Sequence, residues 1–196
     1  NDAASDAARR ISIESTSTWR PDEQIGDQRV RELFERACSV QDAAVASGDA
    51  ESCAGADVIY ARDGLHPQMW GVSKSQFDEF VHIVRAAHKA GKIGRGNESD
   101  PGKPFYYPKE KFDSQEVGPN MHQVNEYVIK DLSKALRPLR GLSYALSKNL
   151  RTGGLRCDLF YSHAWDEGIY ELARHVNSSW PTGCEGAYIC CLSNPQ

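Results

Sequence analysis

A short polar cluster near the end of the chain holds most of the side chains that could do chemistry. It places a hydroxyl, an imidazole, an indole and two carboxylates close together, from Ser162, His163, Trp165, Asp166 and Glu167. A carboxylate here could act as a general acid, a general base or a ribose ligand, so Asp166 and Glu167 are the catalytic candidates. Adjacent strand residues point to opposite sides, which disfavours a Ser162–His163 hydrolase.

The same cluster also has a structural interpretation. Asp166 is expected to cap the following helix, and Glu167 to favour its positive end. Trp165 is expected to pack on the sheet edge. On this interpretation the cluster supports the fold and catalyses nothing.

Two apolar runs and a helical pattern between them should position the cluster. The near-continuous apolar run over 155–162 is typical of a parallel strand covered on both faces. Helical periodicity over 167–180 and a second strand over 186–192 complete a strand–helix–strand unit. Ligands of such sheets bind beyond the carboxyl ends of the strands. The predicted ligand-binding residues are therefore Ser162, His163, Trp165, Glu167 and Asn194.

Residues 26–150 are predicted to be mostly helical. Apolar side chains recur every three or four residues after Ser73 and after Asn120, and each of these residues suits a helix cap. Ser73 and Gln76 fit a capping box. We also expect helices at 27–47 and 143–150, an isolated strand at 56–61, and a long irregular loop at 91–120.

Residues 1–25 are polar and are predicted to form a tail. Arg9-Arg10-Ile11-Ser12 resembles a basophilic kinase site, so Ser12 is a predicted modification site. The chain starts at Asn1 without a methionine, from which we expect a processed product or a fragment.

Composition excludes several classes of protein. The net charge of −4 over 196 residues provides no basic excess for nucleic acid. Apolar runs are far shorter than the roughly 20 residues that a spanning helix needs, so no transmembrane segment is expected. Six cysteines occur without a CxxC pair, which predicts reduced thiols and an intracellular, reducing compartment, either the cytoplasm or an organelle such as a chloroplast. The spacing of Cys184, Cys190 and His163 does not suggest a metal site, and we expect no cofactor.

Three ordered segments resemble a known family. Residues 160–167 are similar to the F-[VYL]-S-H-x-W-x-E segment of a large family of uncharacterised proteins that is abundant in dinoflagellate algae and related protists. Residues 118–130 resemble its GPNMHQVNExxIK segment, and residues 178–181 with 191–196 resemble its SWP…C-x-x-NPQ segment. The resemblance spans residues from about 60 to 196.

The resemblance implies an α/β fold in which residues 151–196 form the N-terminal part of a TIR-like, flavodoxin-like module. Such modules mediate assembly in signalling, and some of them cleave NAD. In the cleaving members the catalytic glutamate lies on a later helix, so no residue of this chain matches it. The family continues with further strands, so we expect either that those strands have been cut from this chain or that the upstream helices and a partner protein cover the sheet.

The leading interpretation is a non-catalytic interaction or accessory protein, held by protein partners as a peripheral subunit or fragment of a larger assembly. An algal organellar complex, such as a photosynthetic one, is one candidate assembly. The first alternative is a TIR-like enzyme that cleaves a nucleotide or NAD at the strand ends. The second is a sensor controlled by phosphorylation at Ser12 or by oxidation of the cysteines.

Overall fold

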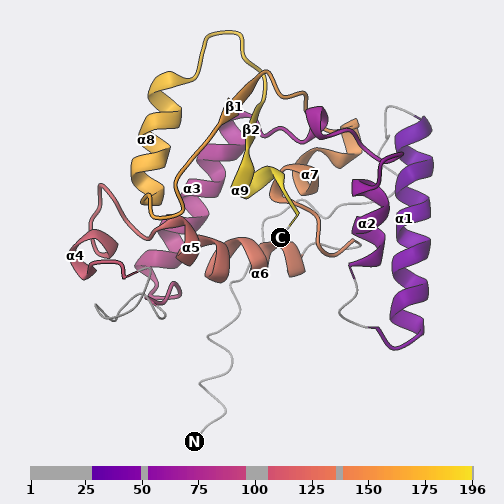
Figure 1. Cartoon of the computed structure of the whole chain (residues 1–196), viewed down its shortest axis with the longest axis horizontal. Coiled ribbons are helices and arrows are strands. Elements are labelled where there is room, and N and C mark those ends of the chain that lie inside the picture. Colours follow the sequence, from indigo (N-terminus) through magenta and orange to yellow (C-terminus); the bar gives the residue numbers. More distant parts are fainter. Residues whose placement is uncertain (1–27, 50–52, 96–105, 136–138, 196) are drawn as a thin grey trace, which may run out of the picture.

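The computed structural model describes residues 28–49, 53–95, 106–135 and 139–195. This part of the chain is mostly helical and contains a two-stranded parallel sheet (Figure 1). The elements are α1 (Gln28–Ala46), α2 (Ala54–Tyr60), η2 (Pro67–Met69), α3 (Lys74–Lys89), α4 (Lys109–Phe112), α5 (Met121–Val124), η4 (Asn125–Ile129), α6 (Lys130–Ala135), α7 (Tyr144–Asn149), η5 (Leu150–Thr152), β1 (Leu159–Tyr161), α8 (Ile169–Ser179), β2 (Ala187–Ile189) and α9 (Cys190–Ser193). The predicted tail, with Ser12, lies outside the described residues.

The two predicted caps are confirmed. The Ser73 hydroxyl accepts a hydrogen bond from the Gln76 backbone N–H, and the Gln76 side chain accepts one from the Ser73 N–H. Asn120 and Gln123 form the same reciprocal pair at the start of α5. The helix after Asn120 continues through η4, a π-helical turn, into α6. The predicted helices over 27–47 and 143–150 correspond to α1 and α7.

The predicted strand–helix–strand order is present, with shorter strands. β1 and β2 are parallel, and Phe160 lies beside Tyr188 in the register. The other edge of β2 makes an antiparallel bridge to Val72, whose N–H and carbonyl both bond to Ala187 at 2.9 Å. The segment before α3 therefore covers part of the sheet edge that the sequence left open.

Two predicted strand boundaries were wrong. Leu155 leaves the predicted first strand and instead makes a bridge with Trp70. The second strand ends at Ile189, because the Ser193 hydroxyl accepts the Ile189 N–H at 3.1 Å and the chain turns into α9. A local side-chain hydrogen bond here replaces the next ladder bond. Cys190 therefore begins a helical turn and does not lie on a strand.

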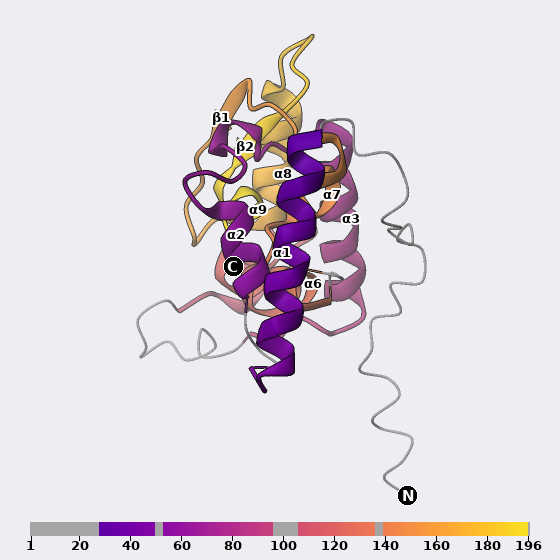
Figure 2. The same cartoon turned by 90° about the vertical axis from the view of Figure 1, so that its right-hand side faces the viewer.

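The predicted isolated strand at 56–61 was also wrong, because α2 is a helix there. It packs on α1 at a short distance, as Figure 2 shows. A Cβ atom on Gly55 would lie 2.6 Å from the Ala37 carbonyl oxygen, so only glycine permits this approach. Ala56 and Ile59, three residues apart, are buried. Packing against α1 outweighs the β-propensity of this short segment.

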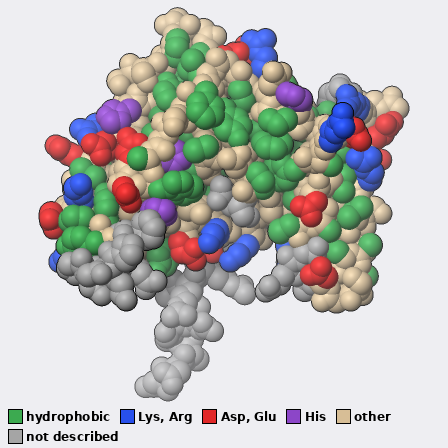
Figure 3. All heavy atoms as spheres, in the orientation of Figure 1, with side chains coloured by type: hydrophobic (Ala, Val, Ile, Leu, Met, Phe, Trp, Pro, Cys, Tyr) green, Lys and Arg blue, Asp and Glu red, His purple; other side chains and the backbone are tan. Residues whose placement is uncertain are grey.

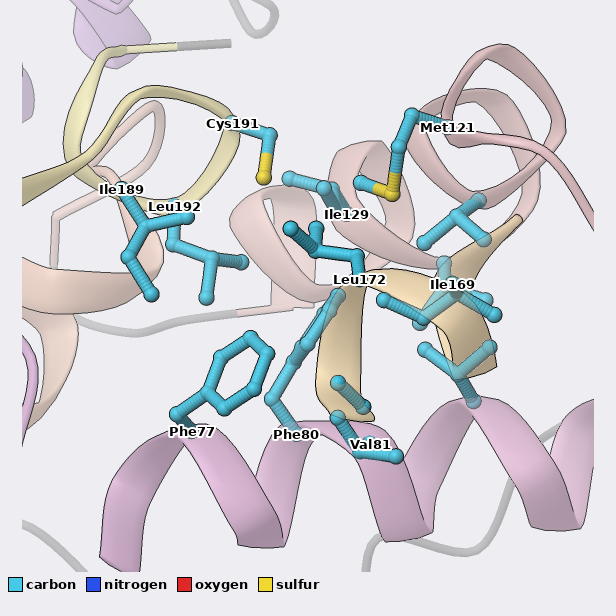
Figure 4. Close-up of a cluster of buried hydrophobic side chains, with 14 of the residues drawn as sticks. Phe77, Phe80, Val81, Met121, Ile129, Ile169, Leu172, Ile189, Cys191 and Leu192 are labelled. Atoms are coloured by element: carbon cyan, nitrogen blue, oxygen red, sulfur yellow. The ribbon is translucent and has the colours of Figure 1, made fainter. Parts of the chain in front are cut away.

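The main core joins the strand–helix–strand unit to the upstream helices. Figure 4 shows Phe77 and Phe80 of α3 pointing toward Leu172 of α8, Met121 of α5 and Leu192 of α9. All five side chains are nearly or completely buried. A second cluster lies under α1 and α2. The unit at 151–196 thus shares its hydrophobic core with α3 and α5.

The face of the sheet that carries Phe160 and Tyr188 is only partly covered, because Tyr188 packs against the second cluster and Phe160 does not. Ala187 and Ile189 of β2 are completely buried, whereas Phe160 of β1 is 67% exposed. The expectation that the first strand is covered on both faces was wrong, because a continuous apolar run does not tell a covered face from an open one. No helix in the described part of the chain is long and apolar enough to cross a membrane.

Candidate functional site at the strand ends

The carboxyl ends of β1 and β2 bring His163 and Cys190 together. His163 follows β1 by two residues, and Cys190 follows β2 directly. The Cys190 Sγ atom lies 3.1 Å from His163 Nδ1. Sequence reasoning placed His163 correctly at this edge but missed Cys190, which it assigned to the strand. The parallel register could have revealed the pair, because Tyr161 lies beside Ile189.

Burial keeps this pair neutral. Desolvation lowers the pKa of His163, while the Glu167 carboxylate opposes that shift. Desolvation also raises the pKa of the Cys190 thiol, although nearby backbone N–H groups partly oppose this shift. Both pKa shifts favour a neutral thiol that donates a hydrogen bond to a neutral imidazole.

His163 Nε2 is buried and has no hydrogen-bond partner among the described residues. A nucleophile–base pair normally has a third group that orients the base. The pair therefore resembles a thiol nucleophile and its base, without the group that would complete a triad.

Trp165 joins the strand-end loop to α5. Its indole stacks on the His122 ring with centroids 5.2 Å apart, and the His163 ring meets it edge-on at 5.4 Å. Its carbonyl accepts the Met121 N–H at 3.0 Å. The expectation that Trp165 packs on the sheet edge was wrong, because α5 supplies the facing ring.

The two candidate carboxylates have different partners. Asp166 Oδ1 lies 4.0 Å from His122 Nε2, and Glu167 Oε1 lies 2.9 Å from His175 Nδ1. The side chain of Asp166 is 74% exposed and that of Glu167 only 17%. Asp166 does not cap α8 as expected, because Gly168 is the N-cap and no side chain caps the helix. The carboxylates thus do not form an acid–base pair.

The other two predicted ligand-binding residues play different parts. Asn194 accepts a hydrogen bond from the Tyr188 hydroxyl through its side-chain oxygen, which fixes the end of α9 to β2. Ser162 is exposed next to the pair. The structure thus brings His163, Trp165 and Cys190 together, and it engages Asn194 in a local contact.

Metal binding has little support from this arrangement. Within the described residues, no three His, Cys, Asp or Glu side chains are grouped so that they could hold a metal ion. The six cysteines are all free thiols. Comparisons of the chain with family models, curated proteins and solved structures found no match.

Proposed function

We propose that this protein is a non-catalytic interaction or accessory protein, which binds a partner protein through the open sheet face, defined here by the exposed Phe160 beside the partly buried Tyr188. One observation carries the proposal. Phe160 is 67% exposed, more than any other large hydrophobic side chain in the described part of the chain. Contiguous apolar patches on a surface are typical of binding sites, and the Phe160 ring is contiguous with the Tyr188 ring.

The open sheet face is preorganised for contact. The Phe160 ring stacks on the Tyr188 ring with centroids 5.5 Å apart and planes 16° apart. The two residues lie on paired strands, so neither ring has to be ordered when a partner binds. In Figure 3 hydrophobic side chains gather over the sheet in the centre of the view. A partner with an apolar surface would bury these rings as aromatic anchors.

The polar cluster supports a binding role better than acid–base catalysis. Asp166 and Glu167 lie beside different histidines, and in the described residues neither is paired with the other. The resemblance to dinoflagellate proteins favours a partner within an algal assembly, in the cytoplasm or in an organelle such as a chloroplast. That assignment of host and compartment is part of the proposal.

Sedimentation of cell extracts tests the proposal. The wild-type chain should travel in a particle heavier than its own 21.8 kDa, and Phe160→Ser should return it to about that mass. Val45→Ser is the matched control, because Val45 is also an exposed apolar residue, at 46%, but lies on α1. A wild-type chain that sediments as a free monomer would refute the proposal.

The contact between Cys190 and His163 favours a second function, acyl transfer through a thiol. Cys190 Sγ would attack the acyl carbon while its proton passes to His163 Nδ1, and the imidazole would return that proton to the leaving group as the bond to the acyl carbon breaks. A water molecule that gives a proton to the same imidazole would then cleave the acyl-Cys190 bond and restore the thiol. The test is hydrolysis of a thioester probe. Activity that is lost in Cys190→Ser and His163→Ala but kept in Ser162→Ala would support this function. The absence of turnover would remove it.

The nucleotide-cleaving alternative stays a prediction. In its test, the chain is incubated with NAD and the turnover of wild type is compared with that of Glu167→Gln. Because Glu167 is paired with His175, we expect no cleavage by either protein.

A further inference from the structure

A surface groove between α3 and α8 is rich in cationic side chains. Its cavity volume is about 800 Å³, and side chains of these two helices line it. Helical spacing explains the lining, because residues three or four apart share a face. Asp78, His82 and Arg85 follow this spacing on α3, as Arg174 and Ser178 do on α8.

The two arginines of the groove have no ion-pair partner in the part of the chain that the structure describes. No carboxylate in the described residues lies within ion-pair distance of Arg85 or Arg174. The Arg85 guanidinium lies 4.6 Å from the centroid of the Tyr170 ring, which holds it in the groove. Among the described residues that line the groove, Asp78 alone carries a carboxylate, and it accepts a hydrogen bond from Asn177 at 2.9 Å. Two guanidinium groups therefore remain available to an anion.

Beneath the guanidinium groups the groove is apolar. Val81, Tyr170 and Ala173 contribute to its lining and are all less than 9% exposed as residues. Binding sites for small molecules commonly combine an apolar surface with a few polar groups that fix orientation. This groove could thus receive an apolar group beside a bound anion.

We propose that the α3–α8 groove binds a small organic phosphate, with the phosphate on Arg85 and Arg174 and an apolar or aromatic group against Val81 and Ala173. The planar fork of guanidinium donors matches phosphate oxygens, and phosphate carries more negative charge than a carboxylate. The proposal does not depend on partner binding at the open sheet face.

Titration calorimetry with phenyl phosphate on the full chain tests the proposal. Arg85→Gln and Arg174→Gln should each weaken binding by about tenfold or more, as expected when one charge-assisted contact is lost. Arg36→Gln on α1 changes the net charge equally and should leave the affinity unchanged. Asp78→Asn removes the negative charge from the groove, so it should tighten binding.

Three further probes define the ligand class. Inorganic phosphate should bind more weakly than phenyl phosphate because it lacks the apolar group, and benzoate should also bind more weakly because it carries less charge. Phe160→Ser should not change the affinity. The proposal is overturned if phenyl phosphate shows no saturable binding, if Arg36→Gln weakens binding as much as Arg85→Gln, or if benzoate binds as tightly as phenyl phosphate. Thermal melts of each variant show that loss of binding is not loss of fold.

Discussion

Replacing Asn149 by Ala should destabilise the protein, because this buried side chain fastens α7 to the segment that borders the sheet. Its Nδ2 donates to the Gly71 carbonyl at 2.9 Å and to Gln76 Oε1 at 3.0 Å. Its Oδ1 accepts from Gln76 Nε2 at 2.6 Å. Gly71 immediately precedes Val72, which bridges to β2. One amide thus joins α7, the α3 cap and the sheet edge.

The size of the effect follows from these contacts. Asn149→Ala leaves the Gly71 carbonyl and Gln76 Nε2 without their partner, while Gln76 Oε1 keeps the Ser73 N–H. An unsatisfied buried polar group costs about 1–3 kcal/mol, and Gly71 is buried. Gln76 is half-buried, so water can replace part of the bond that its amide loses, and the free energy of unfolding should fall by about 2 kcal/mol in total. For a chain of this length, such a loss lowers Tm by roughly 4–8 °C.

Thermal unfolding followed by circular dichroism measures the loss. Asn177→Ala is the matched control, because it removes the same side-chain amide at the surface, where its Nδ2 donates to Asp78. The control should change the free energy of unfolding by less than about 0.5 kcal/mol. If Asn149→Ala costs no more than this control, the network does not support the fold as described. Amide exchange at Val72 should also quicken in the Asn149 variant.

Three other properties can be tested by separate measurements. Burial lowers the pKa of His88 and His163, so the unfolded chain binds more protons than the folded one. The free energy of unfolding should therefore fall as the pH drops below about 6.5, and a urea midpoint that is the same at pH 7.5 and pH 5.5 would contradict this. Burial raises the pKa of Cys157 to about 11, so at pH 8 iodoacetamide should alkylate this thiol about a hundredfold more slowly than a thiol of pKa 9.0. Mass spectrometry measures the rate of alkylation at Cys157 and at the exposed Cys53. Gly154 has φ of +87°, and a Cβ there would lie 2.3 Å from a backbone oxygen, so Gly154→Ala should cost at least about 1–3 kcal/mol in thermal unfolding.

Two of the helices that the sequence predicted correctly begin with a local signal. Ser73 and Asn120 each precede a periodic apolar stripe, and each forms a reciprocal cap with the residue three positions later. The helix α2 has no such signal, because Cys53 makes no side-chain cap. Its helical state depends on α1, which contacts it closely at Gly55. A contact between separate elements cannot be found from local periodicity.

Part of the candidate site could also be predicted from the sequence, and part of it could not. Parallel pairing predicts that the residues after β1 and β2 meet, and His163 does lie beside Cys190. The contact of Trp165 with His122 was not predictable, because it needs the position of α5. The exposure of Phe160 was also missed, since hydrophobicity along a strand does not show whether a partner element covers it.

The open sheet face and the thiol–imidazole pair can be tested separately, because alternation along the strands directs them apart. Phe160 and Tyr188 lie on one face of the sheet, and Tyr161 and Ile189 on the other. The orientation of Cys190 depends on α9, whose ends are tied to β2 by the Ser193 hydroxyl and by Asn194. Substitution of Phe160 removes neither pair of hydrogen-bonding groups, although it takes away the ring that stacks on Tyr188. A loss of partner binding in Phe160→Ser therefore reports on the open sheet face, and any thiol chemistry that persists in that variant belongs to Cys190.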